Sequence, residues 1–207
     1  MQIHVGRPKD LEKKKSILNA AKQLFLMHGY DGSSMNEIAK LAGVTKLTVY
    51  NHFQDKATLF TCAIEETCEA LIQSMPLSLE PSSDFKTSLA EACQISMNIA
   101  NLPEAIKLDL LMMELSAQNN PLVIEFFNAS HGKLNQMWHH FLECAQKLGF
   151  IQHNDIEQQI EILSSLLFGL RHQKILLGLN TPPSSEQQQL IIENAIELFL
   201  YKYKKAV

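Results

Sequence analysis

The sequence lacks the features by which several classes of protein are recognised. Its four cysteines form no CxxC pair, and none of its apolar runs approaches the roughly 18 uninterrupted residues that a membrane-spanning helix needs. It has no strand-like alternation of β-branched residues, no internal repeat and no low-complexity tract. We therefore expect neither a disulfide-rich secreted protein nor a membrane protein, but a reduced cytoplasmic protein.

Motifs that carry catalysis or bind cofactors are also missing. The chain shows no metal-ligand spacing, no nucleophile elbow and no phosphate-binding glycine loop. The side chains left for an enzyme are His139 with His140, His131 with Cys144, and scattered acids. We therefore expect no enzymatic activity, no cofactor and no metal, and a helical enzyme remains only as an alternative.

The sequence instead has helical periodicity in nearly every long segment, which predicts an all-α fold of about nine helices. Capping residues, prolines in first turns and closing glycines set the expected bounds. The predicted helices run from Asp10 to Gly29, from Ser34 to Gly43, from Thr45 toward Asn51 and from Asp55 through Leu71, and then over roughly 84–100, 103–117, 121–148, 155–177 and 184–205. The segment Pro76–Asp84 is the first linker. We expect a small domain over 1–60 and a larger one over 61–207.

Charge is divided unevenly between these two predicted domains. Residues 1–60 hold nine Lys and Arg against five acids, a surplus of four positive charges, whereas the whole chain has a formal net charge of -4. The remaining residues therefore carry a net charge of -8. A basic segment on an otherwise acidic chain favours contact with a polyanion, and the alternative is a set of solvated lysines.

Two short helices joined by a tight turn are expected between residues 29 and 56. Ser34 and Glu37 have the spacing of a capping box at the start of the first helix. Gly43 tolerates the positive φ that a steep crossing of two helices requires. The second helix presents a run of hydrogen-bonding side chains: Thr45, Lys46, Thr48, Tyr50 and Asn51. The pattern predicts a helix-turn-helix, and the alternative is an ordinary helical hairpin.

Residues at many separate positions of this first domain follow a recognisable order and spacing. They are Gly6-Arg7-Pro8, Ile17-Leu18, Ala20-Ala21, Leu24-Phe25, Gly29, Ile38-Ala39, Ala42-Gly43-Val44, Thr48-Val49-Tyr50, His52-Phe53 and Lys56. Together they resemble the DNA-binding domain of the TetR family of transcriptional regulators, in an AcrR-like form, over about residues 6–60. Residues 61–207 match that family only in length and helical content.

The resemblance implies a function as well as a fold. It implies a repressor that binds a palindromic DNA operator as a homodimer, and that is released when a small-molecule effector binds the larger domain. An activator, or an architectural DNA-binding protein without an effector, is the alternative. The regulated genes, the operator and the effector are not expected to be readable from the chain.

The candidate DNA contacts follow from side-chain chemistry together with the resemblance. Thr45 and Lys46 begin the recognition helix, and Lys46 can donate to guanine O6 and N7. Leu47 stands where the family often has glycine or another small residue, so it is a candidate contact to a thymine methyl group. The other expected contacts, which position the protein on the duplex, are Arg7, Ser34, Thr48, Tyr50, His52 and Lys56. For His52 the alternative is a solvated imidazole, and for Tyr50 a packed ring.

Apolar helical faces in the larger domain are candidates for enclosing an effector, because Met and aromatic side chains adapt to irregular apolar guests. Glu114 and His131 are the polar groups expected to orient such a ligand. The candidate pocket residues are Cys93, Met97, Leu110, Met113, Glu114, Phe127, His131 and Trp138. The alternative is a solid core in which these side chains pack against one another.

The last two predicted helices each carry two apolar faces. One face has to pack on its own domain, and a second copy of the chain is the simple partner for the other. Gly169 is expected to allow a close crossing of helix backbones. The candidate dimer interface is Leu166, Gly169, Ile192, Ile196 and Leu200.

Overall fold

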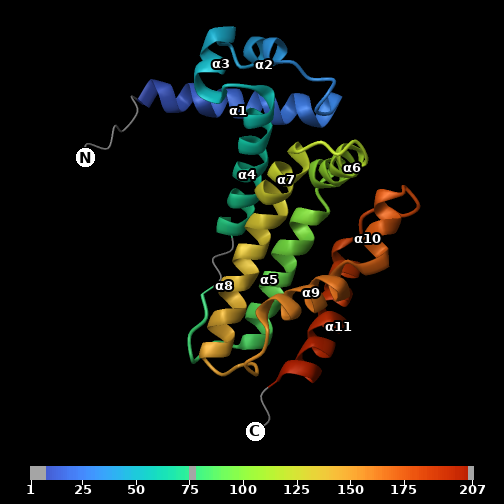
Figure 1. Cartoon of the computed structure of the whole chain (residues 1–207). Helices are drawn as coiled ribbons and strands as arrows, with labels where there is room; N and C mark the ends of the chain where they lie inside the picture. Colours follow the sequence, from blue (N-terminus) through green and yellow to red (C-terminus); the bar gives the residue numbers. More distant parts are fainter. Residues whose placement is uncertain (1–7, 75–77, 205–207) are drawn as a thin grey trace. The chain divides into compact units, whose positions relative to one another are not determined.

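The computed structural model describes residues 8–74 and 78–204, and Arg7 lies outside this part of the chain. The all-α prediction is confirmed, since the described residues form helices and no strand (Figure 1). One isolated antiparallel bridge pairs Ile151 with Lys204. None of the helices in the described segments is long and apolar enough to cross a membrane.

The chain divides into two compact units, which we describe separately. Unit 1 comprises residues 1–67 and 111–129, and unit 2 comprises residues 68–110 and 130–207. The helices in chain order are α1 (Pro8–His28), α2 (Met35–Leu41), α3 (Lys46–Phe53), α4 (Lys56–Ser74), α5 (Phe85–Ala100), α6 (Pro103–Ala117), α7 (Leu122–Phe127), the π-helical turn η1 (Asn128–Gly132), α8 (Lys133–Lys147), α9 (Ile156–Leu167), α10 (Gly169–Leu176) and α11 (Ser185–Tyr203). Because α4 and α6 contribute residues to both units, neither unit is a simple stretch of sequence.

In unit 1, α1 is the longest helix and supplies the apolar stripe on which the shorter helices pack. Its buried side chains recur at helical spacing: Ile17, Leu18, Ala21, Leu24 and Phe25. The helix begins at Pro8, earlier than a cap at Asp10 would give, so Asp10 lies inside its first turn. It ends at His28, and the following residue, Gly29, has φ +73° and donates its amide to the Phe25 carbonyl at 2.9 Å.

An aromatic cluster joins distant parts of unit 1. The ring of Phe60 on α4 lies 4.7 Å from Phe25, 5.0 Å from Tyr30 and 4.8 Å from Phe126, measured between ring centroids. Phe126 belongs to α7, far along the chain from the other three, and its side chain is fully buried. Edge-to-face contacts of this kind stabilise beyond simple burial, so α7 is firmly part of unit 1.

In unit 2, the core is built where α11 packs on α5 and α9, and where α8 packs on α9. The only tryptophan of the chain, Trp138, is buried there, and its indole Nε1 donates to Ser96 Oγ at 2.8 Å. Other fully buried members of this core include Leu89, Cys93, Leu142, Leu163, Ile196 and Phe199. The indole hydrogen bond matters because a buried N–H without a partner costs free energy.

Two helices predicted as single segments are broken in the structure. The predicted helix over 121–148 is α7, then η1, then α8. The predicted helix over 155–177 is α9 and α10, interrupted at Phe168 and Gly169, where the glycine has φ +43°. The guanidinium of Arg171 donates to the carbonyls of Leu166 and Leu167 at 2.9 and 2.8 Å, which satisfies acceptors exposed by the break. Gly169 therefore marks a change of helix direction and not a position inside a continuous helix.

Candidate nucleic-acid interface

The first helix of the predicted helix-turn-helix is fixed at its start by two neighbouring side chains. Ser34 is the N-cap of α2, and its Oγ accepts from the Glu37 amide at 3.3 Å. The Glu37 carboxylate in turn accepts from the Ser34 amide at 3.1 Å and from the Ser34 hydroxyl at 2.6 Å. These hydrogen bonds to the charged form lower the pKa of Glu37 below its ordinary value. The capping box predicted from the sequence is therefore formed, and it engages the Ser34 side chain.

The turn to α3 is as tight as the sequence predicts. Gly43 has φ +67°, a conformation that L side chains rarely adopt. Thr45 then caps α3, and its Oγ1 accepts from the Thr48 amide at 3.2 Å while lying 2.8 Å from the Thr48 hydroxyl. Both threonine side chains are thus oriented by the helix start before any partner arrives.

One face of α3 anchors it and the other stays open. Val49 and Phe53 are buried in unit 1. Leu47 is 69% exposed, and Tyr50 is exposed with the ammonium of Lys46 lying 5.6 Å from its ring centroid. A large apolar side chain that stays this open next to a lysine and a tyrosine marks a candidate contact surface on this face of α3.

The side chain of Lys56 makes hydrogen bonds and a cation–π contact within unit 1. Its ammonium donates to the carbonyl of Tyr30 at 2.8 Å and to that of Ser33 at 3.3 Å. It also lies 4.3 Å from the centroid of the Tyr30 ring. Because two of its three N–H donors are engaged within the protein, we do not retain Lys56 as a DNA contact. No sequence pattern indicates this role, since Tyr30 and Lys56 are far apart along the chain.

His52, a predicted phosphate contact, is mostly enclosed. Its side chain is 15% exposed, and Nε2 lies 3.4 Å from Oδ1 of Asp10 in the first turn of α1. Next to this pair, the ammonium of Lys14 lies 6.0 Å from the Phe53 ring centroid, and Lys13 and Lys15 are also exposed. The lysine-rich turn of α1 therefore borders the end of α3.

The residues predicted to line an effector pocket do not share one environment. Cys93, Met97 and Trp138 pack together in the core of unit 2, where burial raises the pKa of the Cys93 thiol. Leu110, Met113, Glu114, Phe127 and His131 are exposed, and three of them belong to unit 1: Met113, Glu114 and Phe127. For Cys93, Met97 and Trp138 the structure thus has the packed-core alternative, whereas the pocket assignment of the five exposed residues stays a prediction.

Unit 2 also contains a polar cluster that the sequence reasoning missed. The carboxylate of Asp109 on α6 lies 3.0 Å from His172 Nε2 on α10 and 3.7 Å from His131 Nε2 on η1. Nothing in the spacing of three residues so distant along the chain could have indicated it. In residues 8–74 and 78–204, no three His, Cys, Asp or Glu side chains are arranged to hold a metal ion.

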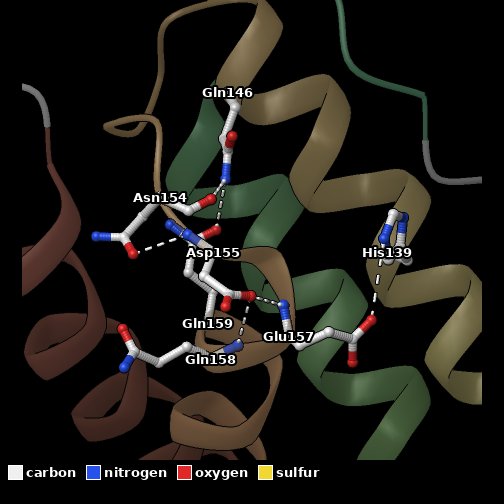
Figure 2. Close-up of polar contacts among 7 residues, drawn as sticks. All are labelled: His139, Gln146, Asn154, Asp155, Glu157, Gln158 and Gln159. Atoms are coloured by element: carbon white, nitrogen blue, oxygen red, sulfur yellow. Dashed lines mark hydrogen bonds and ion pairs between the residues drawn. The ribbon is translucent and has the colours of Figure 1, made fainter.

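A second polar cluster, drawn in Figure 2, ties α8 to the start of α9. The Gln146 amide Nε2 donates to the Asn154 carbonyl and to Gln159 Oε1, both at 2.9 Å. Asp155 caps α9 by accepting from the amide of Glu157 at 2.9 Å. His139 on α8 approaches the Glu157 carboxylate at 3.9 Å. These contacts are local. They satisfy the backbone groups at the start of α9 and fix that start against α8 in unit 2.

The residues predicted for a dimer interface differ in how deeply they are buried. Ile192 and Ile196 are buried in the core of their own protomer, and Leu166 and Leu200 are half-buried against that core. Ile192 and Ile196 are therefore not available to a second copy of the chain, because the core of their own unit already buries the face of α11 on which they lie. The open apolar side chains of α11 are Leu190, Leu198 and Tyr201, of which Tyr201 is 93% exposed. On α10, which buries none of its residues, Leu170 is exposed as well.

A capped pair of short helices, a glycine turn and an open polar face on the second helix together define a helix-turn-helix protein with an additional all-α unit. Comparison with known proteins gives the family. Residues 17–61 match the family of bacterial regulatory proteins called the tetR family, and residues 87–205 match the C-terminal domain of AefR-like transcriptional repressors. The chain belongs to the TetR family.

Curated relatives support the assignment. The transcriptional activator FasR of Mycolicibacterium smegmatis is 31% identical over 87 residues, which cover 42% of this chain and 39% of FasR. The regulator SrpR of Pseudomonas putida is 25% identical over 193 residues, covering 91% of this chain and 84% of SrpR. The chain spans about two-fifths of the length of the first curated relatives it matches.

Solved structures show the same fold along nearly the whole chain. A TetR-family regulator from Mesorhizobium loti superimposes with a TM-score of 0.81 at 24% identity, covering 96% of this chain and all of that one. The flavonoid-responsive regulator FrrA gives a TM-score of 0.74 at 26% identity, covering 94% of this chain and 98% of FrrA.

Proposed function

We propose that this protein is a cytoplasmic transcriptional regulator, most simply a repressor, that binds a palindromic DNA operator as a homodimer and has no enzymatic activity. The observation that carries the proposal is the open face of α3. Lys46 and Leu47 in its first turn are exposed to solvent. Val49 and Phe53 on the opposite face are buried and anchor the helix to the rest of unit 1. A short helix presented in this way suits insertion into the major groove.

The side chains of α3 suggest a division of roles. Thr45, Lys46 and Leu47 at the N-terminal end are proposed to contact base edges, with Leu47 suited to a thymine methyl group and Lys46 to guanine. Thr48, Tyr50 and His52 are proposed to contact phosphates, and Arg7 to reach the backbone or the minor groove. Ser34 contributes by holding the start of α2, and Lys56 is left out because of its internal partners.

DNA binding is tested by fluorescence anisotropy with the DNA upstream of the protein's own gene. We expect saturable binding whose affinity falls steeply with salt, because lysines that bind phosphates release counterions. A mixed-sequence duplex of equal length should bind more weakly at every salt concentration. Equal affinity for both duplexes would support an architectural protein and contradict a sequence-specific regulator.

The direction of regulation is tested in the same system. Of the relatives, BepR of Brucella suis is named a repressor and FasR an activator, so kinship alone supports either direction. For this chain we expect that adding purified protein to an in vitro transcription reaction lowers transcription from the bound promoter. A rise in transcript would make the protein an activator.

The homodimer is proposed to use the open apolar faces of α10 and α11. Leu190, Leu198 and Tyr201 fall on one side of α11, since they recur at helical spacing and are all exposed. Replacing Leu198 and Tyr201 together by glutamate should give monomers in sedimentation velocity. Leu41→Glu, at an exposed leucine of unit 1, is the matched control and should leave the dimer intact. A dimer that survives the double replacement would remove this face from the interface.

The effector is proposed to be a largely apolar small molecule that binds in residues 61–207. The neighbour FrrA is described as flavonoid-responsive, which supports an aromatic ligand as a first choice for screening. Met97 and Trp138 pack in the core of unit 2, so entry between α5 and α8 would have to displace them. Release of DNA should then coincide with a change in Trp138 emission. A compound that releases DNA without altering that emission would place the effector elsewhere.

A further inference from the structure

An acid and an imidazole meet where α1 and α3 come together. Oδ1 of Asp10 lies 3.4 Å from Nε2 of His52. The Asp10 side chain is 60% exposed, whereas that of His52 is only 15% exposed. The imidazole is therefore held in place by its surroundings, and its Nε2 pairs with a carboxylate that is exposed to solvent.

The surroundings of Asp10 are cationic. At 100° per residue, Lys13 and Lys14 lie about 60° and 40° from Asp10 around α1, whereas Glu12 lies about 160° away. Lys14 also reaches the Phe53 ring at 6.0 Å, and that ring lies 6.1 Å from the His52 ring between centroids. Asp10 is thus a negative charge set into the basic border of the recognition helix.

We propose that Asp10 is a positioning residue of the DNA interface that lowers affinity for all DNA sequences alike. It does so by occupying the imidazole nitrogen of His52 that a phosphate would otherwise use. This inference rests on the proposed DNA-binding function. A carboxylate and a phosphate oxygen are both acceptors, and one N–H serves only one of them well. DNA therefore has to displace the Asp10 carboxylate, and the approaching phosphate is also repelled by its charge.

The consequence is a restraint on affinity that carries no sequence information. Contacts to phosphate position a protein on the duplex but do not distinguish bases. Asp10 therefore reduces binding to the operator and to other DNA by a similar factor. Such a restraint keeps the protein from being held on non-specific DNA, since that binding is mostly electrostatic.

The test compares Asp10→Asn with Glu12→Gln, which makes the same charge change on the opposite side of the same turn. Anisotropy is measured for the upstream fragment and for a mixed-sequence duplex across a salt series. Asp10→Asn should raise affinity for both duplexes by about three- to tenfold at low salt. It should also steepen the slope of log K against log salt by up to about 0.9, the value for one additional neutralised phosphate. Glu12→Gln should change affinity by less than about twofold.

A second pair of variants shows whether the effect passes through the imidazole. In a His52→Phe background, Asp10→Asn should lose most of its effect, because the phenyl ring has no N–H to donate. Circular dichroism melting curves confirm that each variant is folded. If Asp10→Asn binds no more tightly than the wild type, or if its higher affinity is undiminished in the His52→Phe background, the inference is overturned while DNA binding stands. If the wild-type chain binds neither duplex, the proposed function falls and the inference falls with it.

Discussion

Different interactions are prominent inside each of the two units of this protein. In unit 1, the helices α2 and α3 are short, and side-chain caps at Ser34 and Thr45 fix where they begin. In unit 2, longer helices share a continuous apolar core around Trp138 and Phe199. Both units have apolar cores, but in unit 1 the caps fix short helices whose outward side chains stay exposed, whereas in unit 2 the long helices bury most of their apolar faces. Substitutions in the two units should therefore lower the free energy of unfolding by different amounts.

The largest effect is expected in the core of unit 2. Trp138→Ala removes a buried ring that lies 5.9 Å from Phe141 between centroids, and it leaves Ser96 without its indole donor. The free energy of unfolding should fall by about 3–5 kcal/mol, as for other large-to-small core changes. Urea unfolding followed by circular dichroism at the helix band measures it. Trp138→Phe retains much of the ring and should lose clearly less, and equal losses for the two variants would contradict the packing account.

A smaller effect is expected at Lys56 in unit 1. Lys56→Met keeps the apolar stem and removes the ammonium, so the Tyr30 and Ser33 carbonyls lose a charged donor. The free energy of unfolding should fall by about 1.5–3 kcal/mol, the range for hydrogen bonds to charged groups. Lys46→Met is the matched control, because Lys46 is exposed and its ammonium lies over the Tyr50 ring. If Lys56→Met is as stable as the control, the internal role assigned to Lys56 is wrong.

The smallest effect on stability is expected at the cap of α2. Ser34→Ala removes the hydroxyl that accepts from the Glu37 amide, and loss of such a cap costs about 1 kcal/mol. Chemical denaturation at neutral pH measures the loss.

The same cap should give unit 1 a dependence on acid. The pKa of Glu37 is lowered in the folded protein by its hydrogen bonds with Ser34. Its contribution is therefore complete above the ordinary carboxyl pKa and is lost as pH falls through the lower folded value. Ser34→Ala should remove this part of the acid sensitivity, so the difference between wild type and variant should shrink as pH falls. A difference that grows on acidification would contradict the capping geometry.

The sequence predicted local structure better than it predicted which faces are buried. The capping box at Ser34 and the turn at Gly43 follow from residue types a few positions apart, so spacing alone was enough. The partners of Lys56 and of Asp109 lie at least twenty residues away, and no periodicity links them. The breaks at η1 and Gly169 were missed because apolar residues continue at helical spacing through both. Ile192 and Ile196 were assigned to a partner because a helix with two apolar faces does not reveal which face its own domain covers.

The account is tested most directly by selecting bound sequences from a pool of randomised duplexes, in parallel for the wild type, Lys46→Ala and Leu47→Ala. All three proteins should be folded alike, because these side chains are exposed and surface substitutions rarely exceed about 0.5 kcal/mol. The wild type should select a two-fold symmetric sequence with half-sites about one helical turn apart, roughly 34–36 Å, or a multiple of it. Each variant should relax the preference at a different base pair in both half-sites. Selection of the same sequence by all three proteins, or of no sequence by the wild type, would contradict reading of DNA by the first turn of α3.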